Sequence, residues 1–282
     1  MGKRRDHRNM NIIEKYFKKH SNYGDIHQDK KRQYGLGITG ILLFICAWAA
    51  GGYAVFSKPE FKHFSGFLPG PTLESLLGLS TSLDFWHAVA ASLRRVFIGI
   101  LVAFSIGFPF GILIGFYKNI RILTYPPIQL LRMVSPLSWM PIALLIFASF
   151  EGAIYFLITM ATVWPIMINT TLGVSRVNPR WLMMAKNQGA RDSQLIWMVI
   201  IPASVPYILT SLRLALGVAW IVLVPAEFLG ISSGLGYLIN DARDTMEYDR
   251  LMAIIIAIGI IGFILDSLIQ LIRKYLDWIW PN

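Results

Sequence analysis

The chain has 282 residues, of which 55% are apolar and 15% are charged, and its mean hydropathy is +0.54. A soluble domain carries about 25% charged residues, so this composition excludes an ordinary water-soluble protein and indicates a lipid environment. The net charge of +10 would suggest a nucleic-acid partner in a soluble protein, whereas in a membrane protein it reports orientation. The single cysteine, Cys46, excludes an internal disulfide and a cysteine cluster for a metal.

Apolar runs long enough to cross a bilayer recur along the chain. A hydrocarbon core of about 30 Å needs roughly 20 residues of helix. The predicted spans are residues 36–56, 96–117, 126–149, 153–174, 199–224 and 251–272. The sequence therefore predicts an all-α membrane protein with a basic tail over 1–35, a six-span domain over 36–273 and a short C-terminal segment over 274–282. Within the tail, residues 12–19 are expected either to form an amphipathic helix at the membrane interface or to stay disordered.

The basic residues gather on one predicted side of the membrane. Of 26 lysines and arginines, 18 fall in the tail, in the loops 118–124 and 175–197 and at the C-terminal end. Four lie in loops on the other side, namely Lys58, Lys62, Arg243 and Arg250. Because cytoplasmic loops are enriched in Lys and Arg, we expect both termini in the cytoplasm and the chain in the plasma (inner) membrane. This explanation of the charge removes the support for nucleic-acid binding.

Charged residues inside the predicted spans indicate specific interactions, because a charge at the bilayer centre costs at least ~2.5–3.5 kcal/mol. Arg132 and Asp266 each lie about 9 Å from the inner end of a predicted span, at 1.5 Å per residue. We therefore expect an Arg132–Asp266 ion pair. Arg213 has no predicted partner and is expected either to face a water-filled cavity or to have a structural role. Arg94 and Arg95 are expected to anchor the outer edge of the second span.

Other patterns concern packing and chemistry. Gly107, Gly111 and Gly115 recur at every fourth position, which allows a neighbouring helix to approach closely. The sequence contains no HExxH motif, no nucleophile elbow and no P-loop, and its histidines all lie outside the predicted spans. We therefore expect no catalytic site, no metal site, no cofactor and no ATPase site in this chain.

The loop over 175–197 contains a predicted short helix. Asn178 is a suitable N-cap, Pro179 favours the first helical position and Gly189 is suited to end the helix. Such a helix is expected either to dock a soluble partner or to lie as a linker at the membrane interface. Its apolar residues are expected on one side, namely Trp181, Leu182, Met184 and Ala185.

Gly189, followed by Val199, Ile201 and Pro202, resembles the EAA loop of ATP-binding cassette (ABC) importer permeases. Met183 and Met184 stand where that family usually has Glu and Ala. Docking to the ATPase is therefore expected to use apolar packing together with Lys186 or Arg191. The residues to which the resemblance assigns ATPase coupling are Pro179, Trp181, Leu182, Met183, Met184, Ala185, Lys186, Gly189, Arg191 and Pro202.

Further pieces between residues 87 and 273 resemble the subgroup of these permeases that carries nitrate, bicarbonate and sulfonates including taurine. The resemblance does not select a substrate, because Arg132, Arg213 and Asp266 match members that carry different solutes. The matching pieces are residues 92–95 with Gly99, 131–136 with Pro141, 164–165 with 169–170, 212–213 with 219–220, 225–227, 233–237 and Asp266.

The resemblance implies the type I ABC importer permease fold and a homodimer docked on two cytoplasmic ABC ATPase subunits, which bind ATP and Mg. It also implies an extracytoplasmic solute-binding protein, for which the acidic segment 232–250 is either the docking surface or merely a solvated loop. The expected substrate is a small oxyanion, with bicarbonate ahead of nitrate or nitrite. Sulfonates such as taurine are the alternative, and a six-span membrane enzyme or receptor is the alternative of another class. The residues expected to line the translocation path are Ser135, Ser138, Trp164, Asn169, Arg213 and Trp220.

Overall fold

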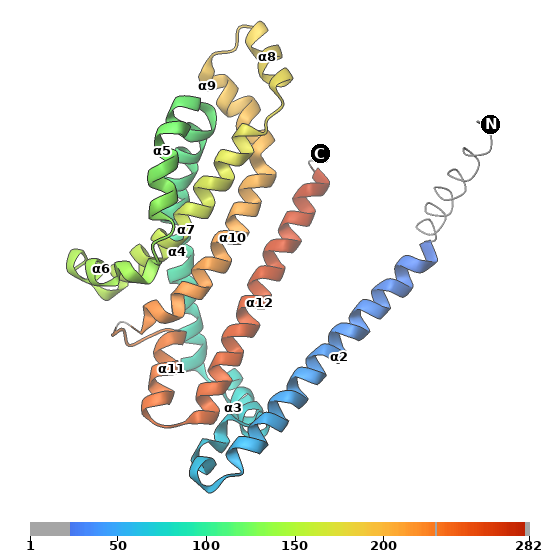
Figure 1. The fold of residues 1–282 in the computed structure, drawn as a ribbon, viewed down its shortest axis with the longest axis vertical. Coiled ribbons are helices and arrows are strands. Elements are labelled where there is room, and N and C mark those ends of the chain that lie inside the picture. Colours follow the sequence, from blue (N-terminus) through green and yellow to red (C-terminus); the bar gives the residue numbers. More distant parts are fainter. Residues whose placement is uncertain (1–22, 229, 280–282) are drawn as a thin grey trace, which may run out of the picture. The chain divides into compact units, whose positions relative to one another are not determined.

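The computed structural model describes residues 23–228 and 230–279, and every regular element in these ranges is a helix (Figure 1). The chain divides into two compact units, residues 1–69 and 70–282. Five of the described helices are long and apolar enough to cross a membrane, and a bent pair makes a sixth if it is one broken span. The predicted all-α membrane fold is therefore confirmed. The orientation of the termini stays a prediction, and the segment 12–19 lies outside the described residues.

The first unit consists of α2 (Tyr23–Phe56) and η1 (Pro59–Phe67). The apolar part of α2, Gly35–Phe56, matches the predicted first span. The helix itself begins earlier, inside the segment expected to be a tail. The indole Nε1 of Trp48 donates a hydrogen bond to the carbonyl oxygen of Phe67 (3.1 Å). This contact folds η1 back against the end of α2.

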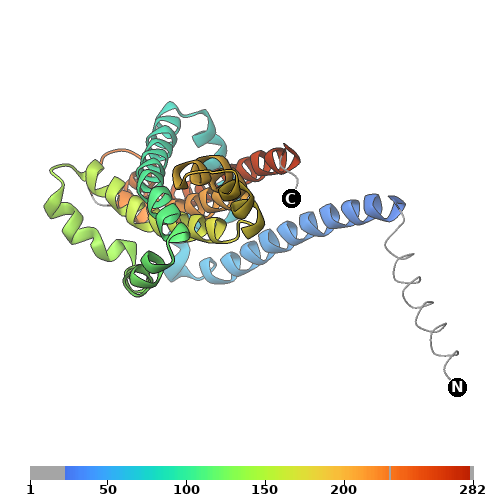
Figure 2. The same cartoon turned by 90° about the horizontal axis from the view of Figure 1, so that it is seen from above.

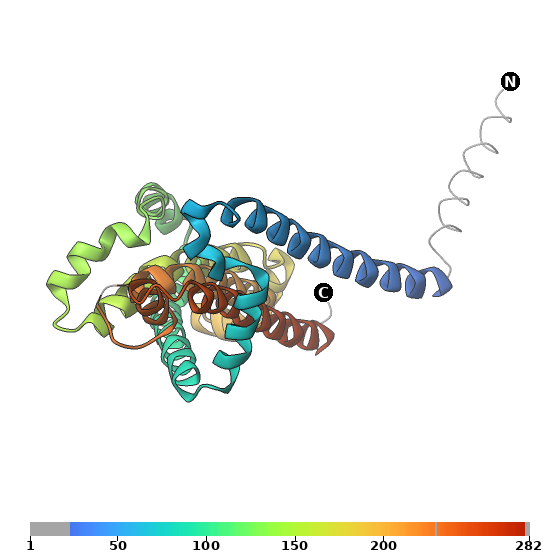
Figure 3. The same cartoon turned by 90° about the horizontal axis from the view of Figure 1, so that it is seen from below.

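The second unit is centred on three long helices, α4, α7 and α10, whose facing side chains form a buried apolar cluster. Seen from above, α8 lies at the near end of this bundle (Figure 2), and seen from below, α3 and α11 lie at the opposite end (Figure 3). The helices of this part, in chain order, are α3 (Pro69–Thr81), α4 (Leu83–Phe116), α5 (Lys118–Leu131), η2 (Pro136–Trp139), α6 (Met140–Ile146), α7 (Phe150–Ser175), α8 (Pro179–Asn187), α9 (Asp192–Leu195), the π-helical turn η3 (Ile196–Ile200), α10 (Ile201–Glu227), α11 (Leu235–Asp244) and α12 (Tyr248–Ile279).

The glycines spaced by four on α4 allow a neighbouring helix to approach closely, as the sequence predicts, and the structure shows that this helix is α7. A Cβ atom at Gly107 would lie 2.9 Å from the carbonyl oxygen of Val163. One at Gly111 would lie 2.8 Å from the carbonyl oxygen of Met167 and 2.6 Å from Cβ of Thr170. Backbone atoms cannot move aside as a flexible side chain does, so only glycine permits this close approach of the two helices.

The prediction of one continuous third span over 126–149 is wrong. The chain instead forms α5, then η2 and α6, with a bend of 84° between the two parts. Pro136 and Pro141 each occupy the first turn of a helix, where a missing N–H is tolerated, and a proline disfavours helical backbone at the residue before it. Ser135 accordingly has an extended ψ of 131°. The predicted loop over 118–124 is the first half of α5.

The contact between α4 and α7 can be tested by adding a methyl group to it. We expect Gly111→Ala to destabilise the protein by about 1–3 kcal/mol, because the added Cβ overlaps backbone atoms of α7. The matched control is Gly217→Ala, where nothing lies within 4 Å of the added Cβ. Thermal unfolding of the two purified variants in detergent measures the difference. Equal unfolding temperatures would contradict the close contact at Gly111.

Candidate functional site

The predicted helix between the fourth and fifth spans is present as α8, with the expected proline in its first turn. Asn178 Oδ1 accepts a hydrogen bond from the backbone N–H of Arg180 (3.0 Å). At the other end, Gly189 has a φ of +80°, and Ala190 donates its N–H to the carbonyl oxygen of Ala185 (3.0 Å). This left-handed ending favours glycine. The predicted start and stop of the helix are therefore confirmed.

The faces of α8 differ from the prediction. Leu182 and Ala185 face the protein, and Leu182 packs on a buried apolar cluster at the ends of α4 and α7. Trp181, Met183 and Met184 point away, with 54%, 64% and 62% of their surface exposed. The expectation that Trp181, Leu182, Met184 and Ala185 share one side is wrong. A helix turns by about 100° per residue. Trp181 and Met184 therefore share one side of α8, and Leu182 and Ala185 share another side about 100° away.

The other residues assigned to coupling surround α8. Lys186, Gly189 and Arg191 are exposed, and Pro202 stands in the first turn of α10. A hollow of about 700 Å³ lies between α8 and the end of α4, with Lys186 in its wall. Lys186, Gly189 and Arg191 are thus exposed in α8 or directly after it. Their contact with an ATPase stays a prediction.

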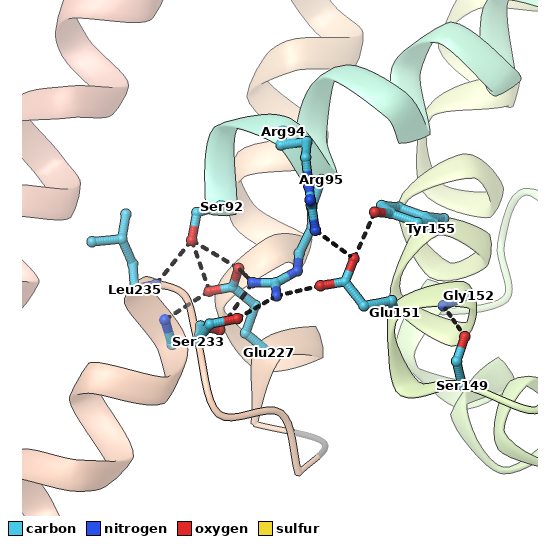
Figure 4. A network of polar contacts seen from close by, with 11 residues as sticks. Ser92, Arg94, Arg95, Ser149, Glu151, Gly152, Tyr155, Glu227, Ser233 and Leu235 are labelled. Atoms are coloured by element: carbon cyan, nitrogen blue, oxygen red, sulfur yellow. Dashed lines mark hydrogen bonds and ion pairs between the residues drawn. The ribbon is translucent and has the colours of Figure 1, made fainter. Parts of the chain in front are cut away.

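A buried polar network lies at the opposite end of the bundle (Figure 4). At its centre is Arg95 of α4, whose side chain has no exposed surface. Its guanidinium donates to Glu227 at the end of α10 (2.7 Å) and to Glu151 at the start of α7 (2.6 Å). Tyr155 donates to the second oxygen of Glu151 (2.6 Å). One cation of α4 therefore joins the start of α7 to the end of α10.

The same network fixes the loop between α10 and α11. Arg95 donates to both the carbonyl and the hydroxyl oxygen of Ser233 (2.9 and 2.8 Å). Glu227 accepts from the hydroxyl of Ser92 (2.7 Å) and from the backbone N–H of Gly236 (2.8 Å). Gly234 has a φ of +108°, and a Cβ there would lie 2.5 Å from both charged groups. The loop can therefore reach the ion pair only with glycine at this position.

Sequence reasoning missed this network. Arg95 was expected to anchor the edge of a span, but α4 begins at Leu83, so Arg95 lies well inside the helix. Arg94 fits the expectation better, since 60% of its side chain is exposed and it reaches Glu151 (3.1 Å). The usable signal was a glutamate, Glu227, at the end of an apolar run and shortly before two glycines. The natural partner of Glu227 was an arginine at a similar depth on another span, namely Arg95.

The predicted ion pair between Arg132 and Asp266 is wrong. Asp266 of α12 instead pairs with Arg213 of α10 through two hydrogen bonds of 2.7 and 3.0 Å, and it also accepts from Gln270 (2.6 Å). The prediction counted depth from a span starting at residue 126, whereas α5 begins at Lys118, so Arg132 lies further along its helix than that count assumed. Arg213 consequently has the partner that the sequence did not show.

The six residues expected to line a path lie at the break after α5, on α7 and on α10. Ser135 and Ser138 are exposed at the break after α5, and Trp164 of α7 packs against a small buried apolar cluster of α4, α7 and α10. Asn169 donates to the carbonyl oxygen of Pro165 (2.8 Å). The indole of Trp220 donates to the carbonyl oxygen of Ile258 (3.2 Å), which places it between α10 and α12 together with the Arg213 ion pair. Their roles in transport stay predictions.

The acidic segment before the last helix is largely occupied by internal contacts. Arg250 pairs with Asp241 (3.3 Å) and Glu247 (2.8 Å), and Asp249 accepts a hydrogen bond from Ser75 of α3. These groups connect α3, α11 and α12. In the part of the chain that the structure describes, no group of three or more His, Cys, Asp and Glu side chains could hold a metal ion.

The network around Arg95 predicts a large effect of a single neutral substitution. We expect Glu227→Gln to destabilise the protein by about 3–5 kcal/mol, because it leaves a fully buried cation short of one carboxylate. Arg94→Gln, at the exposed neighbouring arginine, is the control and should change stability little. Thermal unfolding in detergent compares the two. A Glu227→Gln variant as stable as the control would show that the ion pair is not a main contact.

Comparison with known proteins gives a consistent result. Residues 107–277 match the family described as "Binding-protein-dependent transport system inner membrane component". The chain is 34% identical over 264 residues to the bicarbonate transport system permease protein CmpB of Synechococcus elongatus, covering 88% of this chain and 90% of that protein. It is 35% identical over 255 residues to the taurine transport system permease protein TauC of Escherichia coli, with the same coverage. The nitrate import permease protein NrtB of Leptolyngbya laminosa is 37% identical over 190 residues, covering 67% of this chain and 68% of that protein.

The fold is also similar to that of a solved structure. A chain from the crystal structure of a bacterial ABC transporter involved in the import of the acidic polysaccharide alginate has a TM-score of 0.54. The match covers 91% of this chain and 99% of that chain at 18% identity, which supports the fold alone. The match over residues 107–277 and the long alignments with relatives show that this chain, a multi-pass membrane protein, belongs to the binding-protein-dependent transport system inner membrane component family, the permease subunits of ABC importers.

Proposed function

We propose that this chain is the permease subunit of an ATP-driven importer for a small inorganic oxyanion, with bicarbonate as the first candidate and nitrate or nitrite as the second. The observation that carries this proposal is the 34% identity to a bicarbonate permease over 88% of the chain. Sulfonates such as taurine are the alternative substrate, favoured by an alignment of the same coverage with a taurine permease. Membership of a permease family leaves a six-span enzyme or receptor without support.

In this proposal, α8 docks on a separate cytoplasmic ABC ATPase, which binds ATP and Mg. Three exposed apolar side chains on one short helix support the idea, because clustered exposed apolar residues mark interaction surfaces. They are Trp181, Met183 and Met184, and Trp and Met are enriched in the centres of interfaces. Lys186 and Arg191 would surround this centre. The excess of Lys and Arg on the same predicted side agrees with a cytoplasmic location of α8 and of both termini.

The proposed assembly contains two copies of this chain, two ATPases and an extracytoplasmic solute-binding protein. The description of the family as binding-protein-dependent supports the last partner. It would dock on the face that carries α3 and α11, at the opposite end from α8. Closure of the ATPases would then move the two copies relative to each other and open the path alternately to either side. The buried network around Arg95 would keep the docking face attached to the moving helices.

Uptake into proteoliposomes that contain the full complex tests the substrate. We expect ATP-dependent accumulation of labelled bicarbonate to exceed that of nitrate and of taurine at equal concentrations. The assay should run at alkaline pH, where little carbon dioxide is present to cross the lipid unaided. Vesicles without ATP are the control. If taurine accumulates and bicarbonate stays at the level of the control, the substrate is a sulfonate and the proposed oxyanion is wrong.

The docking surface on α8 makes a second prediction. We expect Trp181→Asp to lower both uptake and coupled ATP hydrolysis about tenfold or more, because loss of a central aromatic anchor at an interface costs about 2 kcal/mol or more. The fold should tolerate this change, since Trp181 is 54% exposed. Trp181→Phe, which keeps an apolar ring, is the control. Unchanged coupling in Trp181→Asp would show that α8 is a linker helix and no docking element.

A further inference from the structure

Two adjoining hollows lie beside α5. The first, of about 320 Å³, lies between α4, α5 and α7, and we name it the deep groove. The second is the hollow of about 700 Å³ between α8 and the end of α4, and we name it the boundary hollow. Arg121 and Ser175 are in the walls of both, so the two hollows meet at these residues.

The deep groove is suited to hydrocarbon, because most of the surface that faces it is apolar. The hydroxyls of Thr171 and Ser175 in its wall donate to backbone carbonyl oxygens of the chain (3.1 and 2.9 Å) and therefore need no polar ligand. A polar ligand would lose its hydrogen bonds to water in such a groove without replacement. The apolar side chains of the wall are Ile114, Ile128, Met167, Ile168 and Leu172.

The boundary hollow lies where a membrane span ends. The apolar helix α4 ends at Phe116. Tyr117 follows directly, lines the hollow and is 41% exposed. Tyrosine is enriched at the level of the lipid headgroups, where its ring meets hydrocarbon and its hydroxyl meets water. The deep groove therefore lies beside the hydrocarbon, and the boundary hollow lies at the level of the headgroups.

Two cations border the boundary hollow, namely Arg121 of α5 and Lys186 of α8. Arg121 is held in place because its Nε and Nη2 donate to the carbonyl oxygens of Ile114 and Gly115. Its Nη1 has no hydrogen-bond partner in the described part of the chain and is free to bind a ligand. Asp192 brings a carboxylate to the same wall, so the net charge of these three groups is positive. Guanidinium and ammonium donors match the oxygens of a phosphate.

The other arginine beside the deep groove lies too far from the boundary to contact a headgroup. Arg132 is eleven residues beyond Arg121. This separation is about 16 Å along a helix, or roughly half of a 30 Å hydrocarbon core. The headgroup contacts are therefore at the Arg121 end of the groove.

We propose that an anionic phospholipid binds to this chain with one acyl chain in the deep groove and its phosphate between Arg121 and Lys186. The inference goes beyond the proposed function and is independent of the imported solute. A free phosphate would leave the deep groove empty, and a zwitterionic lipid would bring its own cation to a site of net positive charge. Anionic lipids are abundant in the cytoplasmic leaflet, which is the predicted side of α8. The bound lipid would connect α8 to α4 and α5.

Thermal unfolding of the purified chain in detergent tests which ligand binds. The probes are phosphatidylglycerol, phosphatidylcholine with the same acyl chains, and inorganic phosphate at the same concentration. A ligand that binds only the folded chain raises the unfolding temperature, and we expect phosphatidylglycerol to raise it by about 5 °C more than the other two. Equal shifts with the two lipids would overturn the proposed selection by charge. An equal shift with inorganic phosphate would show that the occupant is a free anion.

Three variants locate the site. Ile128→Trp fills the deep groove with an apolar ring, and Arg121→Gln removes the fixed cation. We expect each of them to lose most of the shift that phosphatidylglycerol gives. Leu130→Trp, at a residue of α5 that is 69% exposed, is the matched control and should keep the full shift.

The variants also show how the proposal would fail. A full shift in Ile128→Trp would overturn the position of the acyl chain, and a full shift in Arg121→Gln would overturn the position of the phosphate. Loss of the shift in Leu130→Trp would show that the lipid binds elsewhere on α5. If Arg121→Gln does not fold, the comparison of Ile128→Trp with Leu130→Trp decides.

Discussion

The arrangement of the second unit depends on the neutralisation of Arg95 where three long helices meet. A fully buried cation persists only with carboxylates beside it, and Glu151 and Glu227 supply them from α7 and α10. Glu227 also holds the backbone of Gly236, so α11 is attached at the same point. The close packing of α4 on α7 through glycines then joins these two helices over several turns. The face of the protein that carries α3 and α11 is therefore coupled to its core.

The opposite end of the bundle is built differently. There α8 presents exposed apolar side chains on a short helix whose ends are set by local hydrogen bonds. Leu182 attaches it to the core, and the π-helical turn η3 leads from it into α10. The end that carries α11 is thus held together by buried charges, and the end that carries α8 has an exposed apolar surface. A permease that is driven from one side and receives its substrate from the other needs both properties.

Between the two ends, the charge balance inside the membrane singles out the broken third span. Two of the arginines at this depth are neutralised by carboxylates of distant helices, and these ion pairs serve to join helices. Arg132 has no such partner in the described part of the chain and stands where α5 ends. The prolines at 136 and 141 cause this break, because each forces a new helix to start. An unpaired charge and an interrupted helix each lower the stability of the fold. Their occurrence at the same place therefore indicates a functional role.

Features that depend on neighbours along the chain were predictable from the sequence. Five of the spans follow from the length of apolar runs, the close approach of a helix to α4 follows from glycines spaced by four, and α8 follows from Asn178, a proline and Gly189. The choice of ion-pair partners was not predictable in this way. Asp266 pairs with Arg213, 53 residues away, and not with Arg132, whose expected depth was counted from residue 126 although α5 begins at Lys118. Arg95 likewise became a buried centre only once α4 was seen to begin at Leu83 and α10 to end at Glu227. Helix starts and stops are local, whereas the neutralisation of a buried charge depends on which distant helices pack together, and only the tertiary structure decides that.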